Sequence, residues 1–472
     1  MSFVFYDTET TGTHTSFDQI LQFGAIHTDS ELNELGRLDI KCRILPDIVP
    51  SPGAMQITGI RANQLIDSSL PSHYEMVRHV REKLLSWSPA VFIGYNSIGF
   101  DEHLFRQALY KTLHPPYLTN TNGNSRTDAM RMVQAASIFT PNALKIPVGD
   151  RRKRVFKLDR VAPANGFAHE RAHDALADVE ATIFLCRLLA EQAPDVWSSF
   201  MRFSQKAAVI DYISSERIFC FSDFYFSQPF SCLATRIGIN SKNSSEFYIF
   251  DLEVDPSRLL RLSQKKLITR LGESPKPVRR LRSNASPILW AAEEAPDIAS
   301  AKHIGIEELE RRVQFLESNG EFCDRLIDVF EAAKEPRGPS PYVEEQIYDA
   351  FFTDIDQELL ESFHRAPWEE RPAIVDRLKD ERLRILGHRL IHSERPNLLD
   401  KKHCQVLDVA LAKRILGSEG EKVPWTTLSQ AMQEWRNLNE EDKRGPEFLR
   451  EHKKYIADRL EYATACTKNA PR

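Results

Sequence analysis

The chain opens with Phe3-Val4-Phe5-Tyr6-Asp7-Thr8-Glu9, in which a short apolar run leads into two carboxylates. Such a run predicts a buried strand, and the period of two in a strand places Asp7 and Glu9 on the same face. Two acids held that close together favour a divalent cation. A D-x-E pair alone is equally compatible with a solvated strand end, so the choice between these interpretations depends on the rest of the chain.

A third acid follows another buried strand. The apolar run at residues 90–95 continues through Asn96-Ser97-Ile98-Gly99-Phe100 to Asp101, at the start of a predicted helix. The helix dipole also favours an acid at this position, which leaves a purely structural role for Asp101 open.

The segment His173-Asp174-Ala175-Leu176-Ala177-Asp178 supplies a histidine and a fourth acid. Asp174 is predicted to be the N-cap of a helix over residues 175–189, which places His173 just outside the helix and Asp178 one turn inside it. A histidine at a helix start is also common as a plain surface residue. His169 lies four residues before His173, a spacing that on a helix could bind zinc. However, Pro163, Asn165 and Gly166 indicate a loop there.

Taken together, these pieces predict one chemistry. Hard oxygen ligands without cysteine or paired histidine suit Mg²⁺ or Mn²⁺ better than zinc. Two such ions about 4 Å apart can stabilise both the attacking and the leaving oxygen of a phosphodiester. A neutral histidine can deprotonate the attacking water. The set therefore predicts hydrolytic phosphodiester cleavage.

Length and composition bound the class of protein. A chain of 472 residues with 42% hydrophobic and 27% charged residues fits two or three globular domains and excludes a disordered, collagenous or coiled-coil chain. The net charge of −5 means that nucleic-acid binding must come from local patches. No apolar run approaches membrane-spanning length. The seven cysteines are scattered, and the early acids leave no room for a signal peptide, so we expect a cytoplasmic protein.

The pattern of predicted secondary structure changes twice along the chain and so divides it into three parts. Up to about residue 190, short apolar strands alternate with helical patterns, which is typical of an α/β fold. From about 194 to 336, short β-like runs are separated by Ser, Asn and Pro clusters and followed by a helical tail. Residues 335–341, rich in proline and glycine, form the clearest linker, and the remainder is helical. We therefore predict domains at 1–192, 195–337 and 342–472.

The acidic set resembles the DEDDh exonucleases. The resemblance rests on Asp7-x-Glu9-Thr10-Thr11-Gly12, on Asn96 to Phe100-Asp101, and on His173-x₄-Asp178. It implies an RNase H-like α/β domain with a mixed sheet and removal of nucleotides from the 3′ end. It also implies two Mg²⁺ ions, replaceable by Mn²⁺, with His173 as general base. The implied metal ligands, which also count as catalytic residues, are Asp7, Glu9, Asp101 and Asp178.

Within that superfamily the chain is more closely similar to the bacterial exodeoxyribonuclease I family. The similar segments are 94–102, Asn124-Ser125-Arg126-Thr127-Asp128, 172–179 and 346–354. The resemblance implies an SH3-like β domain and an all-helical C-terminal domain after the exonuclease domain, although residues 195–335 match weakly. It further implies a monomer that digests single-stranded DNA processively to nucleoside 5′-monophosphates in DNA repair and recombination. A partner is implied as well, the acidic C-terminal tail of single-stranded-DNA-binding protein. The implied substrate-binding residues are Thr8, Glu9, Asn96, Arg106, Tyr117 and Lys157.

Two basic regions are candidates for strand binding. The first is Arg151-Arg152-Lys153-Arg154 with Lys157 and Arg160, beside His173 in sequence; the alternative is a solvated loop. The second holds nine basic residues against the single acid Glu273: Arg258, Arg261, Lys265, Lys266, Arg270, Lys276, Arg279, Arg280 and Arg282. It could take DNA or an acidic protein tail. Nearby aromatic residues between Phe219 and Phe230 are interpreted mostly as core.

Two alternative functions stay open at this point. One is an RNA-directed or proofreading exonuclease, against which the long extension beyond residue 190 argues. The other is a non-catalytic scaffold that binds single-stranded nucleic acid, against which the occupation of all five catalytic positions argues.

Overall fold

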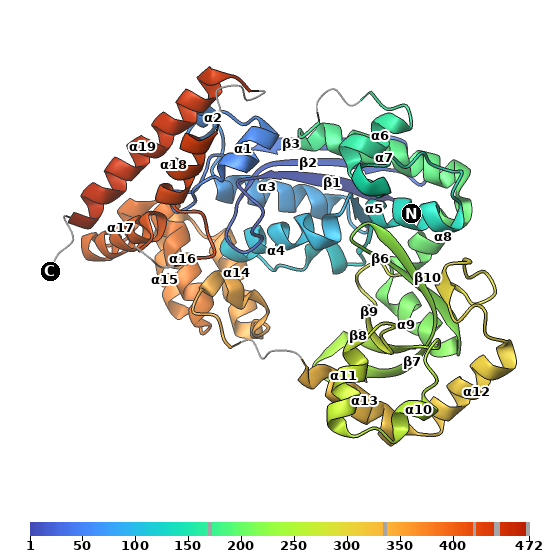
Figure 1. Ribbon diagram of the computed structural model, residues 1–472. Coiled ribbons are helices and arrows are strands. Elements are labelled where there is room, and N and C mark those ends of the chain that lie inside the picture. Colours follow the sequence, from blue (N-terminus) through green and yellow to red (C-terminus); the bar gives the residue numbers. More distant parts are fainter. Residues whose placement is uncertain (169–171, 334–337, 419–421, 439–443, 469–472) are drawn as a thin grey trace.

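The computed structural model describes residues 1–168, 172–333, 338–418, 422–438 and 444–468. At its centre lies a five-stranded mixed sheet in the order β3-β2-β1-β4-β5, visible edge-on at the top of Figure 1. The first unit is built from β1 (Phe3–Thr10), β2 (Ile20–Thr28), β3 (Glu34–Lys41), α1 (Pro52–Thr58), α2 (Ala62–Leu65), α3 (His73–Ser86), β4 (Val91–Gly94), α4 (Asp101–Lys111), β5 (Ser125–Asp128), α5 (Ala129–Phe139), α6 (Leu158–Ala164) and α7 (Ala175–Gln192).

The central strand β1 is buried on both faces. Phe3 and Phe5 pack with α5 and α7, whereas Val4 and Tyr6 pack with α3 and α4 on the opposite side. β1 runs antiparallel to β2 and parallel to β4. The alternation confirms the predicted strand and places Asp7, which continues the Phe3–Phe5 face, on the side of α7.

The second unit is mainly an antiparallel sheet in the order β10-β6-β7-β8-β9, with β11 paired to β7. Its elements are α8 (Pro194–Phe203), α9 (Lys206–Ser215), β6 (Phe219–Tyr225), β7 (Gln228–Asn240), β8 (Asn243–Asp251), α10 (Ser257–Leu260), α11 (Gln264–Gly272), β9 (Val278–Arg282), β10 (Ile288–Ala291), β11 (Ala299–Ser300), α12 (Ile306–Glu317) and α13 (Gly320–Ala332). The β-rich segment thus begins with two helices. α8 packs Val196 and Phe200, one helical turn apart, into the core of the first unit.

The C-terminal part is helical, as predicted. It comprises α14 (Asp354–Arg365), α15 (Arg371–Arg377), α16 (Glu381–Glu394), α17 (Lys401–Leu416), α18 (Leu428–Asn437) and α19 (Pro446–Lys468). Both groups of helices share cores with the first unit. α14–α16 pack against α3 and α4 around Tyr110 and Phe363, and α17–α19 pack against α1 and α2 around Met55 and Trp435.

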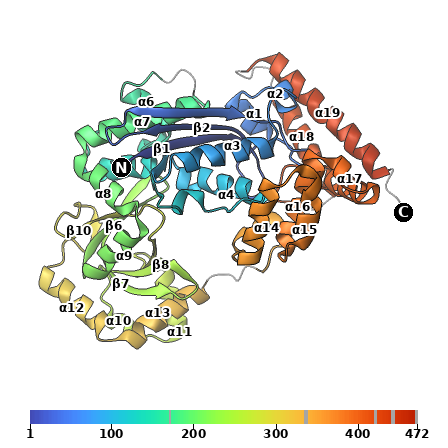
Figure 2. The same ribbon diagram turned by 180° about the vertical axis from the view of Figure 1, so that it is seen from behind.

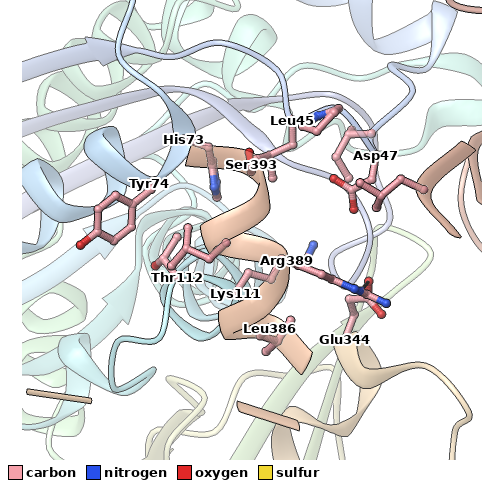
Figure 3. Close-up of a pocket in the computed structure, with 14 residues that line it drawn as sticks. Leu45, Asp47, His73, Tyr74, Lys111, Thr112, Glu344, Leu386, Arg389 and Ser393 are labelled. Carbon is pink, nitrogen blue, oxygen red and sulfur yellow. Dashed lines mark hydrogen bonds and ion pairs between the residues drawn. The ribbon is translucent and has the colours of Figure 1, made fainter. Parts of the chain in front are cut away.

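The seam between the first unit and α16 encloses a cavity of about 60 Å³ (Figure 3). Glu344 is buried at its edge and accepts ion pairs from Arg389 at 3.0 Å and Arg414 at 2.8 Å. Burial lowers the pKa of Lys111 at the same seam, and Glu344 opposes this shift. Both ion pairs lie within the C-terminal part, whereas hydrogen bonds cross the seam: the Gln107 side chain donates to the Glu344 carbonyl at 2.7 Å, and the Tyr110 hydroxyl donates to the Val343 carbonyl at 3.2 Å.

The second unit and the C-terminal helices attach to opposite ends of the first unit, in both views of the molecule (Figures 1 and 2). All seven cysteines are free thiols, and five of them are buried. Among the described residues, no helix combines the length and apolarity needed to cross a membrane.

Candidate active site

Strand register places the first two acids against the start of α7. Asp7 lies opposite Gly24 on β2, and Glu9 lies opposite Gln22. A Cβ atom at Gly24 would come within 2.7 Å of the Ala175 backbone, so only glycine lets the first residue of α7 approach β2 this closely. The absent side chain therefore brings the N-terminus of α7 to the two carboxylates.

The N-terminus of α7 is held in a fixed orientation. Asp174 accepts a hydrogen bond from the Ala177 N–H at 3.2 Å, which confirms it as the N-cap. Gln22 donates to Asp174 at 3.2 Å, so β2 supports the cap directly. His173 has a φ of 67°, a left-handed conformation that is uncommon for a residue with a Cβ. Its N–H donates to the Asp178 carboxylate at 3.4 Å.

Asp101 is the first residue of α4, after the connection from β4. Asp128 accepts hydrogen bonds from the N–H groups of Asn96 at 2.9 Å and Ile98 at 3.1 Å, which fixes the connection into α4. The Thr8 hydroxyl donates to Asp101 at 2.5 Å. Of the predicted substrate-binding residues, Thr8 thus bonds an acid of the cluster, and Asn96 has a φ of 63° in the loop before Asp101.

Three of the five predicted catalytic residues lie close together, and the charges of the four acids act within the same cluster. One ligand atom each of Glu9, His173 and Asp178 lies within 4.8 Å of the other two. Burial raises the pKa of Glu9 to about 8 and that of Asp178 to about 7, with repulsion from neighbouring acids adding to both shifts. The pKa of Asp7 is raised well above its usual value by burial and by the charges of Asp101, Asp178 and Glu9. Burial also raises the pKa of Asp101 to about 7. A cluster of oxygen ligands with mutual repulsion fits divalent cations.

The pKa of His173 is lowered, whereas the pKa values of the four acids are raised. Partial burial lowers the pKa of His173, the positive charges of Arg444 and Lys157 lower it further, and Asp159 opposes them. His173 is therefore neutral at physiological pH, the state that a general base requires.

The acidic cluster predicts an unusual pH dependence of stability. An acid whose folded pKa is raised stabilises the fold while protonated, and this stabilisation is lost as the pH rises from its unfolded pKa of about 4 through the folded value. With chelator, the melting temperature should fall between pH 5 and 8, and Mg²⁺ should raise it more at pH 8 than at pH 6. Asp101→Asn should flatten the metal-free profile. Equal pH slopes for the variant and the parent in thermal melts would exclude this electrostatic coupling.

A second buried charge cluster surrounds Glu102, the residue after Asp101. Its carboxylate accepts hydrogen bonds from Arg106 at 2.7 Å, Thr119 at 2.7 Å and Tyr6 at 3.2 Å, and it pairs with Arg126. Burial acts to raise the pKa of Glu102, but the two arginines hold it below its usual value. The network locks β1, α4 and β5 together behind the acidic cluster.

The same network defines the position of two predicted substrate-binding residues. Arg106 is buried, pairs with Glu102, and lies 5.0 Å from the centre of the Tyr117 ring. Tyr117 is half-buried and 6.2 Å from the ring of Phe351, which is exposed. Arg106 thus supports an aromatic surface and is not itself presented to solvent.

Glu102→Leu should destabilise the protein strongly. It would leave the guanidinium groups of Arg106 and Arg126 buried without their counter-ion, which costs about 3–5 kcal/mol. Urea unfolding measures the loss. The matched control is Glu82→Leu, because Glu82 forms an exposed ion pair with Arg78 at 3.2 Å, and such pairs contribute roughly 1 kcal/mol or less. Equal losses for the two variants would refute the assigned role.

The basic regions have different environments. Lys157 is exposed immediately before α6, and Arg152 and Lys153 are exposed as well. In the second region, the basic residues on β9 are partly neutralised by ion pairs. Its strand residues pair with acids that are distant in sequence: Arg279 with Asp251, Arg280 with Glu246 and Glu331, and Arg282 with Glu246.

Exposed cations of this second region remain on and around α11: Arg258, Arg261, Lys265, Lys266 and Lys276. Phe219 and Phe221 are core residues as predicted, whereas Phe226 at the β6–β7 turn is 91% exposed. His169, the candidate zinc ligand, lies outside the described residues.

Comparisons with known proteins point to the same chemistry. The model of the Exonuclease family matches residues 4–185, and that of the Exonuclease I C-terminal domain matches residues 341–459. Exodeoxyribonuclease I of Escherichia coli is 28% identical over 401 residues, covering 82% of this chain and 84% of the relative. Exonuclease I from Methylocaldum szegediense superposes with a TM-score of 0.84 at 23% identity, covering 97% of this chain and 99% of that structure. E. coli exonuclease I in complex with a dA16 oligonucleotide superposes with a TM-score of 0.83 at 24% identity, covering 98% and 99%.

Proposed function

The chain belongs to the exodeoxyribonuclease I family of DEDDh exonucleases, and from this we propose that it hydrolyses single-stranded DNA in the 3′→5′ direction with Mg²⁺, releasing nucleoside 5′-monophosphates. Membership of this family makes the chain an exodeoxyribonuclease. The direction of digestion, the metal ion and the product are what we propose in addition. The observation that supports the metal-dependent chemistry is the clustering of Glu9, His173 and Asp178 with the charges of Asp7 and Asp101 beside them, whereas the direction and the product follow from the family.

The residues divide into two roles. The carboxylates of Asp7, Glu9, Asp101 and Asp178 would hold two Mg²⁺ ions, with Mn²⁺ as a substitute, and when bound these ions would stabilise charge on the attacking and leaving oxygens. His173 accepts the proton of the attacking water, because its lowered pKa keeps the imidazole unprotonated. Its left-handed backbone beside the capped α7 aims the ring toward Glu9 and Asp178. Lys157, exposed nearby, is suited to the phosphate of the terminal nucleotide.

The direct test uses end-labelled oligonucleotides. With Mg²⁺, a 3′-labelled single strand should lose its label at once as a mononucleotide, whereas a 5′-labelled strand should shorten gradually. Chelator should stop both reactions, and RNA or blunt duplex DNA should react much more slowly. Early release of the 5′ label would overturn the proposed 3′→5′ direction. Equal rates of hydrolysis on RNA and single-stranded DNA would favour the RNA-directed alternative.

The proposal also covers the domain division, the oligomeric state, the cellular role and the protein partner. We propose that the division into domains 1–192, 195–337 and 342–472 holds for folding, with an SH3-like sheet in the middle. The protein would act as a processive cytoplasmic monomer in DNA repair and recombination. The acidic tail of single-stranded-DNA-binding protein would be a partner, and the exposed cations Arg261, Lys265 and Lys266 around α11 are one candidate surface for it.

A further inference from the structure

Helix α1 is joined to the chain just beyond the end of β1, the strand that carries Asp7 and Glu9. The Ser51 N–H, at the N-cap of α1, donates to the Thr11 carbonyl at 2.7 Å, two residues beyond Glu9. Only seven residues long, α1 cannot be stable by itself and depends on its surroundings for its position. In Figure 1 it lies between the sheet and the C-terminal helices α18 and α19.

Arg444, just before α19, caps the far end of this helix. Its guanidinium donates to the Gln56 carbonyl at 2.8 Å and the Ile57 carbonyl at 2.6 Å, which belong to the last turn of α1 and have no partner within the helix. A cation at a helix C-terminus is also favoured by the helix dipole.

Gly59 makes room for this contact. It has a φ of 71° at the C-cap of α1, and its N–H donates to the Met55 carbonyl at 2.9 Å. A Cβ atom at Gly59 would approach the Arg444 guanidinium to 2.6 Å. The arginine and the glycine therefore form one fitted contact between the C-terminal helices and the active-site side of the first unit.

Further contacts fasten the same two parts. Arg61, which follows α1 in the chain, forms a bidentate ion pair with Glu451 of α19 at 2.8 and 2.9 Å. Met55 is fully buried against the C-terminal helices, in a core that includes Trp435. α1 is thus supported from the C-terminal side by Arg444, by Arg61 and by apolar packing.

Arg444 is also close enough to His173 for its charge to act on that ring. We propose that Arg444 is a positioning residue of the active site: by capping α1, it lets the C-terminal helices hold the wall of the site beside Glu9 and His173. The inference rests on the proposed nuclease function for its kinetic readout. It gives the C-terminal helices a role in the chemical step, in addition to any role in holding long DNA.

The test compares Arg444→Met with the parent enzyme on two substrates. One is the p-nitrophenyl ester of thymidine 5′-monophosphate, which occupies only the active site, and the other is a long single strand. Loss of positioning should lower kcat on the ester about tenfold or more, with a KM change below threefold, and should lower the rate on long DNA by the same factor. Arg450→Met is the matched control, because Arg450 is an exposed residue of α19. Hydrogen exchange of residues 52–60 provides a readout independent of activity and should become faster in Arg444→Met only.

The remaining outcomes distinguish positioning of α1 from a direct effect of the Arg444 charge on the substrate. Arg444→Lys keeps the charge but cannot bridge both carbonyls, so it should restore less than half of the lost kcat. Full rescue by lysine with unchanged exchange in α1 would show a charge acting on substrate and would overturn the positioning role. A defect confined to long DNA, or parental kcat in Arg444→Met, would overturn it as well. If the parent enzyme cleaves neither the ester nor the long strand, the proposed function fails, while the exchange measurement still decides the contact with α1.

Discussion

Asp178→Ala is expected to abolish hydrolysis while leaving single-strand binding nearly intact. The variant removes an acid that lies within 4.8 Å of Glu9 and His173 and whose pKa is raised by burial and by its acidic neighbours, and losing about 4 kcal/mol of transition-state stabilisation lowers the rate roughly a thousandfold. Binding is expected to survive because it depends on basic and aromatic groups elsewhere. Product release from a labelled oligonucleotide measures the first effect, and fluorescence anisotropy measures the second.

The same variant separates lost chemistry from lost folding. Because the acids repel one another and burial raises their pKa values, removing one should raise the metal-free melting temperature at pH 8. Asp195→Ala is the control, since Asp195 is an exposed acid in the first turn of α8. Retained cleavage by Asp178→Ala would exclude Asp178 as a metal ligand.

His173→Asn is expected to lower kcat by roughly a hundredfold to ten-thousandfold, the usual contribution of a general base. Asparagine is the best replacement, because it tolerates the positive φ of 67° that alanine adopts only with strain. The pKa of His173 is lowered, so the rate of the parent enzyme should rise with pH up to that pKa, below about 6.5, and then level off.

The pH profile identifies the base. In His173→Asn the limb that belongs to this imidazole should disappear, leaving only the dependence that arises from metal binding by the acids. His79→Asn, a change at an exposed histidine of α3, should leave the rate and the profile unchanged. An unaltered acidic limb in His173→Asn would assign the base to another group.

Local signals were sufficient to predict the elements that carry the acids. Asp7 and Glu9 follow from strand periodicity, and Asp174 as N-cap follows from its place before an apolar helical pattern; the structure confirms both. The positive φ of His173 and the close approach of α7 to Gly24 have no counterpart in either pattern, because they arise only when α7 is placed on β2. Gly24 was itself the one available signal for that approach.

Contacts between distant segments were beyond the sequence reasoning. Glu102 follows a predicted catalytic acid, but its partners Arg106 and Arg126 become identifiable only when α4 and β5 are side by side. The partners of the basic residues on β9 are hidden for the same reason, since Asp251, Glu246 and Glu331 lie outside the segment 258–282. Equally, no local pattern links Arg444 to α1.

The most direct test of the central claim is anomalous X-ray diffraction from crystals of the protein soaked in Mn²⁺. The account predicts two manganese peaks about 4 Å apart, bound by the carboxylates of Asp7, Glu9, Asp101 and Asp178, with His173 beside them. Manganese peaks elsewhere and none within reach of these four side chains would contradict it.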